Sequence, residues 1–244
     1  MAELPEAKAL SPSTVDNLKL TSTATLTTTL FKRGFRNTFI QDVRPLASYG
    51  ANMVGAAFTL RYIPAREDLD SYGVVPDPNA LQREVMDGVP EGHVLVMDCR
   101  RDVRVASAGD VYVTRLLVCG AAGIVSDGGI RDSAAIARLG LPVFCAGPSA
   151  PSNRILHRAV DYNVPIGCGG VAVYPGDIMV GDADGVAVVP RGLVDEVAAD
   201  AAEQERLENY ILRRVAKGEL LEGLYPVSDK TRADYAAWRR TTGD

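Results

Sequence analysis

Over the middle of the chain, continuous apolar runs typical of strands alternate with segments whose apolar residues recur at helical spacing. The predicted elements of this region are, in order, strand 56–63, helix 79–88, strand 94–99, helix 111–119, strand 123–126, helix 132–139 and strand 142–146. Regular alternation of this kind indicates an α/β domain. The charged, proline-containing segment 61–77 is predicted to be a loop, and Asp127-Gly128-Gly129 a turn.

The two ends of the chain have different patterns. The first forty residues are predicted to be helical, although the threonine-rich run 21–29 lowers helix propensity. Later the pattern is that of β-structure, with glycine bends in 164–173 and a hairpin that turns at Asp182-Ala183-Asp184. A long helix over 193–216 and a late one around 233–239 follow. One domain with helical additions at both ends is therefore expected.

The composition is that of an ordinary globular protein, and it excludes several partners. The chain has 244 residues, 47% of them apolar, and 26 basic against 31 acidic side chains give a net charge of −5. Nucleic-acid-binding proteins normally carry a basic excess. No run approaches the ~18 apolar residues of a membrane-spanning helix, and the first twenty residues lack the apolar core of a signal peptide. We therefore expect a cytoplasmic protein that binds neither nucleic acid nor membrane.

Two scarce residue types narrow the chemistry further. Histidine occurs only at positions 93 and 157, which disfavours a histidine-rich zinc or iron site. Lysine is absent from 33–216, so the core cannot supply a Schiff-base or P-loop lysine. The cysteines form no C-x-x-C pair and are interpreted as buried reduced thiols. They stand at positions 99, 119, 145 and 168.

The segment 123–132, GIVSDGGIRD, is a candidate site because it follows a predicted strand and opens a helix. Glycines let the backbone approach a ligand closely, and N–H groups at a helix start favour an anion. Arg131 can bind a carboxylate through its guanidinium fork. Asp132 can either cap the helix or ligate a hard cation. The competing interpretation is a helix cap beside a surface arginine.

A second segment, 108–112, also opens a predicted helix after a strand-like run and supplies another acid, Asp110. Asp110 and Asp132 are then expected close together, at the points where the strands of two neighbouring βα units end and their helices begin. Two acids and an arginine at such a point suit an anionic substrate whose reaction is assisted by a metal ion.

Together these motifs resemble the RraA-like family, which includes the metal-dependent 4-hydroxy-4-methyl-2-oxoglutarate/4-carboxy-4-hydroxy-2-oxoadipate aldolases. The resemblance is carried by Gly109-Asp110-Val111-Tyr112, by the run from Asp127 to Asp132, and by the 22-residue step from Asp110 to Asp132. It continues through Gly169-Gly170-Val171, 174–178 and 181–186. It covers about 53–214 of a single domain spanning 1–244, with a helical N-terminal extension at 1–40 and a C-terminal tail at 218–244.

The resemblance implies both a fold and an assembly. The fold would be a three-layer β/β/α sandwich of the swivelling-domain type, an α/β class, with helical N- and C-terminal additions. The assembly would be a homotrimer or a hexameric dimer of trimers with sites between subunits. In the aldolases a glutamate on a late helix reaches a neighbouring subunit's site. Three residues are open candidates for that role here: Glu203, Glu205 and Glu208.

The resemblance also implies roles for the candidate site residues. Asp132 would ligate Mg²⁺ or Mn²⁺, largely through a shell of water, and Asp110 would hydrogen-bond to that water. Arg131 would bind the carboxylate or carbonyl oxygen of the pyruvyl unit. The backbone N–H groups of the turn Gly109, Asp110, Val111 and Tyr112 would bind the same carboxylate. Arg131 and Asp110 would be the catalytic side chains.

The implied activity is that of a lyase: a divalent-metal-dependent aldolase that cleaves a 4-hydroxy-2-oxo acid and releases pyruvate, with oxaloacetate decarboxylation as a side activity. Such a reaction must stabilise an enolate. Because the core has no lysine for an imine, a metal ion acting as a Lewis acid is the other route, and Arg131 would add a fixed charge beside the oxyanion. The alternative is a non-catalytic regulator that binds a ribonuclease. A phosphoryl-carrying domain is a weaker third option, since neither histidine is placed for it.

Several other residues have structural explanations. His93 is expected to make a local hydrogen bond at a strand start, and His157, flanked by arginines, to lie on the surface. Trp238 is expected to pack against the body or another subunit. Arg61 and Arg66, in the predicted loop, suggest that the substrate is anionic beyond its pyruvyl end. Three acids are interpreted as turn formers rather than ligands: Asp177, Asp182 and Asp184.

Overall fold

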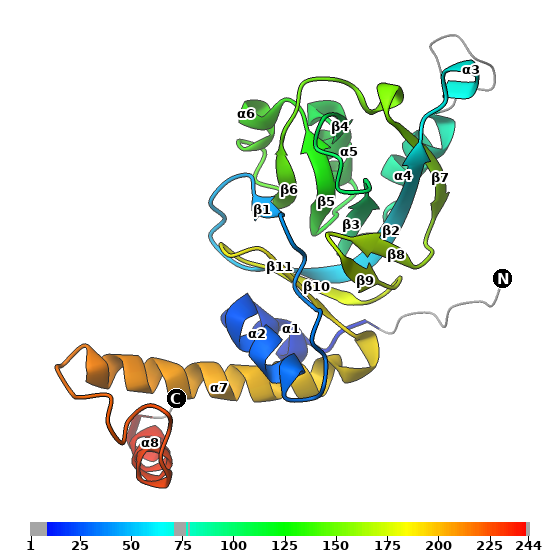
Figure 1. The fold of residues 1–244 in the computed structure, drawn as a ribbon. Coiled ribbons are helices and arrows are strands. Elements are labelled where there is room, and N and C mark those ends of the chain that lie inside the picture. The colour runs from blue at the N-terminus through cyan, green and yellow to red at the C-terminus, as the bar shows by residue number, and fades with distance from the viewer. Residues whose placement is uncertain (1–8, 71–76, 78, 243–244) are drawn as a thin grey trace.

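The computed structural model describes residues 9–70, 77 and 79–242. Figure 1 shows a body of strands and helices from which one long helix projects. The strands are β1 Arg44–Pro45, β2 Met53–Pro64, β3 His93–Asp98, β4 Ala106–Ala108, β5 Gly123–Ile130, β6 Val143–Pro148, β7 His157–Tyr162, β8 Ile166–Cys168, β9 Val171–Val173, β10 Ile178–Gly181 and β11 Val186–Val189. The helices are α1 Pro12–Leu20, α2 Thr23–Phe31, α3 Glu67–Asp70, α4 Ala80–Gly88, α5 Asp110–Val118, α6 Ser133–Ile136, α7 Val194–Val215 and α8 Asp229–Thr242, with short 3-10 helices at Asn153–Ile155 and Arg191–Leu193.

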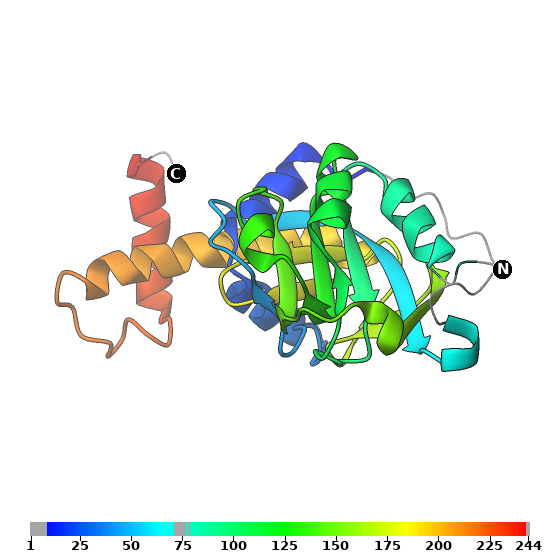
Figure 2. The same ribbon diagram turned by 90° about the horizontal axis from the view of Figure 1, so that it is seen from above.

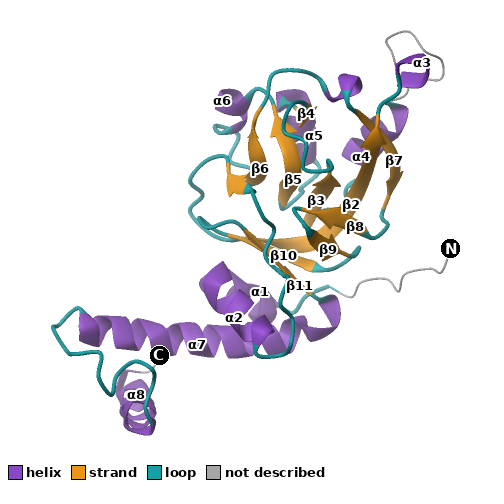
Figure 3. Cartoon of the chain, viewed as in Figure 1, coloured by secondary structure: helices purple, strands orange, loops and turns teal. Residues whose placement is uncertain are grey.

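The larger sheet has nine strands, and its central strands are parallel. Its order is β1-β6-β5-β3-β2-β10-β11, with β4 beside β5 and β7 beside β2. Strands β6, β5, β3 and β2 run parallel, whereas β1, β7, β10 and β11 pair antiparallel. The sheet curls until it is nearly closed, and β8 and β9 form a separate hairpin (Figure 3). The predicted α/β class is confirmed, and the likeness to a swivelling domain stays a prediction.

Three clusters of buried apolar side chains hold the layers together. One lies between the parallel strands and helices α4, α5 and α6, and includes Leu95 and Leu116. A second fills the inside of the curl, where Val94 and Val96 face β8 to β11. A third joins β10 and β11 to α1, α2 and α7. Because alternate residues of β3 serve the first two clusters, each central strand is buried on both faces.

The long helix α7 extends beyond the body, and α8 packs against its projecting half (Figure 2). We call this projecting half of α7 together with α8 the arm. The arm has its own small core of Leu207, Ile211 and Tyr235, to which Trp238 adds its ring 5.2 Å from that of Tyr210. Trp238 therefore packs within its own chain. No helix in the described residues is long and apolar enough to cross a membrane.

The segment 127–129 is not a turn, contrary to the sequence prediction. β5 continues to Ile130, and all eight of its residues are buried. The glycines are needed for space: a Cβ on Gly128 would lie 2.5 Å from the Cβ of Cys99, and one on Gly129 would lie 2.6 Å from the carbonyl oxygen of Val105. The Asp-Gly-Gly run therefore marks a strand that neighbouring segments approach closely.

Two other predicted boundaries are also wrong. The helix predicted over 132–139 is a single turn, because α6 ends at Ile136 and turns follow it. The loop predicted over 61–77 starts as strand, since β2 runs to Pro64, and then contains α3. Residues 71–76 of that loop and 1–8 of the predicted N-terminal helix lie outside the described residues.

Candidate active site

The two motifs singled out in the sequence meet at one end of the sheet. β4 runs beside the C-terminal end of β5, where Ala108 pairs with Ile130. The helix α5 begins two residues after Ala108, at Asp110. The backbone N–H of Arg131 donates to the carbonyl of Ala108 at 3.1 Å. The start of α5 therefore lies against the residues that follow β5, as the sequence predicts, and β4 is the strand-like run expected before α5.

Asp132 joins the two motifs through its carboxylate. Oδ2 accepts a hydrogen bond from Nε of Arg131 at 3.2 Å and one from the backbone N–H of Asp110 at 3.4 Å. The backbone of Asp132 is left-handed, with φ of 57°, a conformation that Asp and Asn tolerate better than most residues. Its side chain makes no cap hydrogen bond to α6. Asp132 therefore stands at the N-cap position of α6, as one interpretation of the sequence expects, but its side chain does not cap the helix.

Arg131 keeps most of its hydrogen-bonding capacity for a ligand. Its side chain is 49% exposed, and its Nε is held by Asp132. Neither of its terminal nitrogens has a hydrogen-bond partner among residues 9–70, 77 and 79–242. Two parallel N–H donors on a planar group match the two oxygens of a carboxylate. Asp132 thus positions the Arg131 side chain, and the terminal guanidinium nitrogens are left to bind the carboxylate of a ligand.

A pocket of about 270 Å³ opens at this junction. The backbone at the start of α5 contributes to its wall, where helix N–H groups favour an anion. One of these groups, the N–H of Val111, is directed to Oδ1 of Asp110 at 2.8 Å. The pocket is lined by Asn79, Ala106, Ser107, Ala108, Gly109, Asp110, Val111, Tyr112, Arg131, Ser152 and Asn153. Sequence reasoning finds the central members of this set and misses Asn79, Ser107, Ser152 and Asn153, which belong to no recognisable motif.

A larger hollow, of about 550 Å³, lies around Tyr49 and Phe144 at a different place on the sheet. Its described lining includes Asp182 and Asp184 but no arginine, lysine or histidine. An anionic substrate would meet only negative charge there. The smaller pocket at Arg131 is therefore the better candidate for such a substrate.

Gly109 leaves no room for a side chain between its backbone and the two charged side chains. A Cβ at this position would lie 2.6 Å from Oδ2 of Asp132 and 3.0 Å from Nε of Arg131. The backbone of Gly109 is extended, with φ of −134°, so the need for glycine is one of space. The missing side chain lets Asp132 and Arg131 lie directly against the start of α5.

Replacing Gly109 by alanine should displace Asp132 and Arg131 and lower activity while the protein stays folded. Misplacement by about 1 Å can cost on the order of 10²-fold in rate, so a loss of at least about 10-fold in kcat/KM is expected. The measurement is steady-state kinetics together with a thermal melt. Gly192→Ala is the matched control, because an added Cβ there meets nothing within 4 Å. Equal activity of the two variants would show that the crowding at Gly109 has no functional consequence.

A network of buried polar groups adjoins the pocket through Ser107. The carboxylate of Asp127, 2% exposed, accepts the backbone N–H of Cys99 at 2.6 Å and that of Gly169 at 3.0 Å. Burial raises the pKa of Asp127. The thiol of Cys99 lies 3.0 Å from Oγ of Ser107, whose backbone lines the pocket, and burial raises its pKa to about 12. Cys99 is therefore a neutral thiol that positions the network and not a nucleophile.

The donors at the junction fit a hard divalent ion that keeps much of its water. Mg²⁺ is commonly held by one or two carboxylates with several waters, and the Asp132 carboxylate, 38% exposed, stands beside the backbone of Asp110 with room around it. Within the described ranges, no group of three or more His, Cys, Asp or Glu side chains is gathered. A fully protein-coordinated site is thus not built from these residues, whereas a mostly hydrated one is compatible with them.

The structure agrees with the sequence prediction for His93 and differs from it for His157 and Cys119. His93 lies at the start of β3 with Nδ1 3.1 Å from the carbonyl of Glu91, as expected. His157 is not on the surface: it is 1% exposed, and its two ring nitrogens have no hydrogen-bond partner within the described residues. Inward and outward side chains alternate along β7, which turns His157 inward and its neighbour Arg158 outward. All four cysteines are free thiols, but Cys119 is only half-buried.

The burial of His157 should make the protein less stable in mild acid. Burial lowers the pKa of its imidazole, with Asp102 opposing and Arg100 and Arg104 adding to the effect. The folded state then keeps the ring neutral while the unfolded chain takes up a proton below 6.5. The free energy of unfolding should fall with pH from 6.5 down to the lowered pKa, by up to about 1.4 kcal/mol per pH unit.

Urea unfolding at several pH values between 5 and 7.5 measures this dependence. His157→Phe, which fills the space beside Tyr62 with an uncharged ring, should show a smaller slope over the same range. An unchanged slope in the variant would assign the acid sensitivity to other groups.

The remaining acids singled out in the sequence are engaged within this chain. Oδ2 of Asp177 accepts the backbone N–H of Tyr174 at 2.9 Å, and Oδ1 of Asp182 accepts that of Asp184 at 2.9 Å, so both form turns. The three candidate glutamates on α7 are also engaged: Glu203 binds Arg239, Glu205 binds Ser22, and Glu208 binds Gln204. All three lie on a helix that covers β10 and β11, away from the pocket of their own chain.

Comparison with known proteins gives consistent matches. A family model described as "RraA-like: Aldolase/RraA" matches residues 23–188. A protein of Halalkalibacterium halodurans named "Putative 4-hydroxy-4-methyl-2-oxoglutarate aldolase" is 41% identical over 114 residues, which are 47% of this chain and 54% of that protein. The chain thus spans about half the length of this curated relative.

Two solved structures resemble the whole body of the protein. An uncharacterized protein from Pseudomonas syringae pv. tomato superposes with a TM-score of 0.75 at 27% identity, over 89% of this chain and 98% of that one. Streptomyces coelicolor RraAS2, described as an unusual member of the RNase ES inhibitor RraA protein family, superposes with a TM-score of 0.74 at 30% identity, over 83% of this chain and 97% of that one.

Proposed function

This chain belongs to the RraA-like family, and from that membership and the geometry of its pocket we propose that it is a carbon–carbon lyase that releases pyruvate. The substrate would be a 4-hydroxy-2-oxo acid, cleaved by a retro-aldol reaction that depends on Mg²⁺ or Mn²⁺. One observation carries the proposal: the Arg131 guanidinium and the start of α5 line a single pocket, and the carboxylate of Asp132 accepts a hydrogen bond from each of them. Curated relatives named as aldolases support the same reaction class.

Arg131 and the start of α5 would bind the pyruvyl unit. The terminal guanidinium nitrogens would donate to the carboxylate or the 2-oxo oxygen, and the helix N–H groups of 109–112 would donate to the carboxylate. Those of Asp110 and Val111 would exchange their present bonds to Asp132 and Asp110 for it. When the bond between C3 and C4 breaks, its electron pair moves toward the 2-oxo oxygen, and the C4 hydroxyl becomes a carbonyl and gives its proton to water. Water then returns a proton to C3, so that pyruvate forms. The fixed positive charge of Arg131 then lies beside the developing negative charge, where it stabilises the transition state more than the bound substrate.

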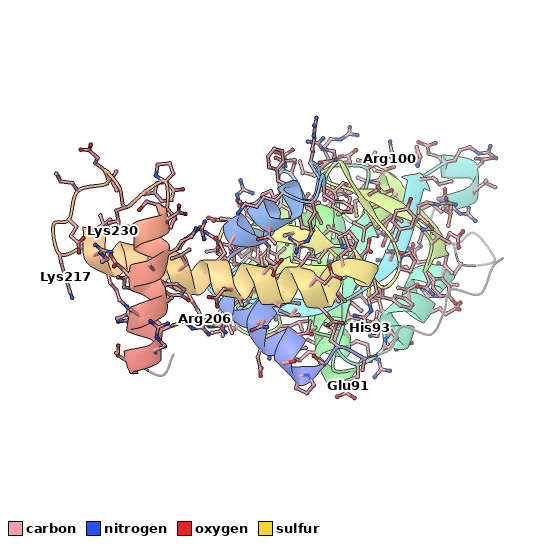
Figure 4. The ribbon with its side chains drawn as sticks, turned by 90° about the horizontal axis from the view of Figure 1, so that it is seen from below. Glu91, His93, Arg100, Arg206, Lys217 and Lys230 are labelled. Atoms are coloured by element: carbon pink, nitrogen blue, oxygen red, sulfur yellow. The ribbon has the colours of Figure 1, made fainter. Side chains whose placement is uncertain are left out.

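Asp132 would hold the metal ion, and Asp110 would hydrogen-bond to the water around it. A bound divalent ion supplies Lewis-acid polarisation of the 2-oxo group. An imine mechanism would instead need a lysine near the pocket. Lys217 and Lys230 lie on the arm, away from the sheet (Figure 4). The segment 33–216, which forms the sheet, contains no lysine.

The same chemistry extends to a second substrate. Loss of carbon dioxide from oxaloacetate also leaves a pyruvate enolate, so the groups that stabilise one product stabilise the other. We expect oxaloacetate decarboxylation as a side activity of this site.

The proposed assembly is a homotrimer or a dimer of trimers. Two apolar side chains of α5 are strongly exposed: Val111, which lines the pocket, at 75%, and Val118, at the other end of the helix, at 72%. Exposed apolar side chains grouped beside a functional site commonly mark a subunit interface. A neighbouring copy packed on this face would bring its own residues toward the pocket, which is where a glutamate of α7 would enter.

The second candidate function is a non-catalytic regulator that binds a ribonuclease. The likeness to RraAS2, itself described as a member of an RNase inhibitor family, favours it. The contact between Arg131 and Asp132 at a pocket favours the enzyme, because a protein that only binds a partner has no need of that arrangement. The two functions differ in whether pyruvate is released.

A coupled lactate dehydrogenase assay distinguishes them. With oxaloacetate and a panel of 4-hydroxy-2-oxo acids, we expect pyruvate release that needs Mg²⁺ or Mn²⁺ and stops when EDTA is added. Asp132→Asn protein in the same buffer is the blank, because a free metal ion decarboxylates oxaloacetate by itself. If no 2-oxo acid in the panel yields pyruvate above that blank, the lyase is wrong and the regulator is favoured.

A further inference from the structure

The segment 31–39, FKRGFRNTF, interleaves phenylalanine with basic residues and contains no acid. Three of the five phenylalanines of the chain stand in these nine residues, together with one lysine and two arginines. The longer stretch 17–41 carries four basic side chains and no acidic one, although the whole chain has a net charge of −5. This part of the sequence is therefore a positive, aromatic stretch in an acidic protein.

The fold holds the segment at both of its ends. α2 ends at Phe31, and the chain then turns at Gly34, whose φ of 90° is left-handed. Phe35 is tied back to α2 by its backbone N–H, which donates to a carbonyl of that helix at 3.1 Å. Phe39 is tied to β11, where it forms a bridge with Ala187. The side chains between these contacts thus stand on a backbone that is already positioned.

A hollow of about 300 Å³ lies between this segment and the last turns of α2. That volume is at the lower end of the ~300–1,000 Å³ of small-molecule sites. All three phenylalanines line it, and two of them are strongly exposed, Phe31 at 62% and Phe35 at 37%. Large apolar side chains that gather on a surface commonly mark a binding site. The hollow shares no residue with the pocket at Arg131.

Arg36 brings a positive charge to the same hollow. Its side chain is exposed, and within the described residues its guanidinium has neither an ion pair nor a hydrogen bond. Arg33, in contrast, is engaged by Asp200 and by the carbonyl of Thr29. Of the described residues that line the hollow, none is acidic. A ligand there meets aromatic rings, one uncommitted guanidinium and neutral polar groups.

This combination of groups selects a ligand with two different parts. Aromatic side chains stack on the faces of nucleobases with little regard to which base is present. The planar fork of an arginine matches the oxygens of a phosphate. A purely apolar ligand would leave Arg36 without a partner, and a small anion would leave the rings of Phe31 and Phe35 exposed. A nucleoside phosphate uses both features.

We propose that the hollow at Phe31, Phe35 and Arg36 binds a nucleoside phosphate, with its base on the phenylalanine rings and its phosphate on the guanidinium. This site is independent of the proposed lyase. A free nucleotide and one unpaired nucleotide of a strand present the same chemistry. Because a net charge of −5 disfavours a long nucleic acid, the free nucleotide is the expected source.

Three matched probes separate the two parts of the ligand. AMP carries both parts, adenosine lacks the phosphate, and ribose 5-phosphate lacks the base. Isothermal titration of the full-length protein should show saturable binding of AMP and affinities lower by roughly 10-fold or more for each of the other two probes. AMP that binds no more tightly than either of its parts overturns the site.

The variants assign each part to its side chain. Phe35→Leu keeps an apolar group and removes the ring, so it should weaken AMP and adenosine by roughly 10-fold and leave ribose 5-phosphate unchanged. Phe31→Leu is the second ring variant, should the first fail to fold in a thermal melt. Arg36→Gln should weaken AMP and ribose 5-phosphate and leave adenosine unchanged. Leu20→Ala and Lys19→Gln are the matched controls, because both side chains are exposed and neither lines the hollow.

The remaining outcomes are also decisive. An unpaired oligoadenylate identifies the source: the same affinity per nucleotide as AMP supports a free nucleotide, and much tighter, salt-dependent binding supports a strand. An equal loss of adenosine and ribose 5-phosphate in Arg36→Gln overturns the assignment of the phosphate. If AMP does not bind and the phenylalanine variants change the oligomeric state in sedimentation, the rings belong to an interface between copies and the site is wrong.

Discussion

Replacing Asp132 by asparagine should abolish metal-dependent turnover and leave the fold unchanged. Asparagine tolerates the left-handed backbone at this position, where φ is 57°, and it has the shape of aspartate. The substitution therefore removes a negative charge and little else. One carboxylate anchors an otherwise hydrated ion in the proposed site. Its loss should weaken metal binding by more than the roughly 10- to 100-fold that loss of a supporting residue costs.

Mn²⁺ titration followed by water-proton relaxation measures the metal directly, without reference to turnover. A thermal melt reports on the fold, and Asp184→Asn, at an exposed hairpin turn, controls for removal of an acid. Alanine at position 132 is a less informative change, because an L-residue in the left-handed conformation costs roughly 1–2 kcal/mol. Full activity of Asp132→Asn at limiting Mg²⁺ would show that this carboxylate is not the metal ligand.

The contact between the two motifs can be predicted from sequence because each follows a strand of a parallel sheet. The C-terminal ends of such strands meet at one edge, so residues 22 apart in the chain become neighbours. The strand pattern alone therefore places Arg131 beside Asp110, and the hydrogen bonds around Asp132 agree. Their chemical roles stay predictions, since contact alone does not establish them.

The errors have local physical causes. Asp-Gly-Gly is a strong turn signal in isolation, and nothing in the sequence shows that Cys99 and Val105 press against those glycines. The surface position predicted for His157 is wrong because it lies on a strand next to Arg158, and adjacent strand side chains point to opposite faces. The first error depends on residues distant in the chain, whereas the second follows from the strand itself.

The cluster of Asp77, Arg83 and Arg154 could not be predicted at all. These residues share no motif and come from three separate places: the segment before α4, the helix α4 itself, and the 3-10 helix before β7. Arginines on a surface helix are ordinarily interpreted as solvated charge. Only the fold shows that two of them meet on one acid.

Lysine at position 131 should keep the positive charge and lose most of the activity. Arg131 uses Nε to hold Asp132 at 3.2 Å and leaves the planar pair of terminal nitrogens for the substrate. A lysine ammonium has no such fork, so it cannot serve both partners at once. We expect a loss on the order of 10²-fold or more in kcat/KM, as when one transition-state donor is removed.

The division of that loss between kcat and KM identifies its origin. If Arg131 only attracted an anionic substrate, an ammonium would do nearly as well, and any effect would appear in KM. Because part of the contact strengthens as negative charge develops on the substrate oxygen, kcat should fall as well. Arg115→Lys, on the exposed face of α5, measures the effect of the same exchange away from the pocket. Near-wild-type kinetics for Arg131→Lys would reduce this side chain to a surface arginine, and the anion-binding role of the junction would then rest on the helix N–H groups alone.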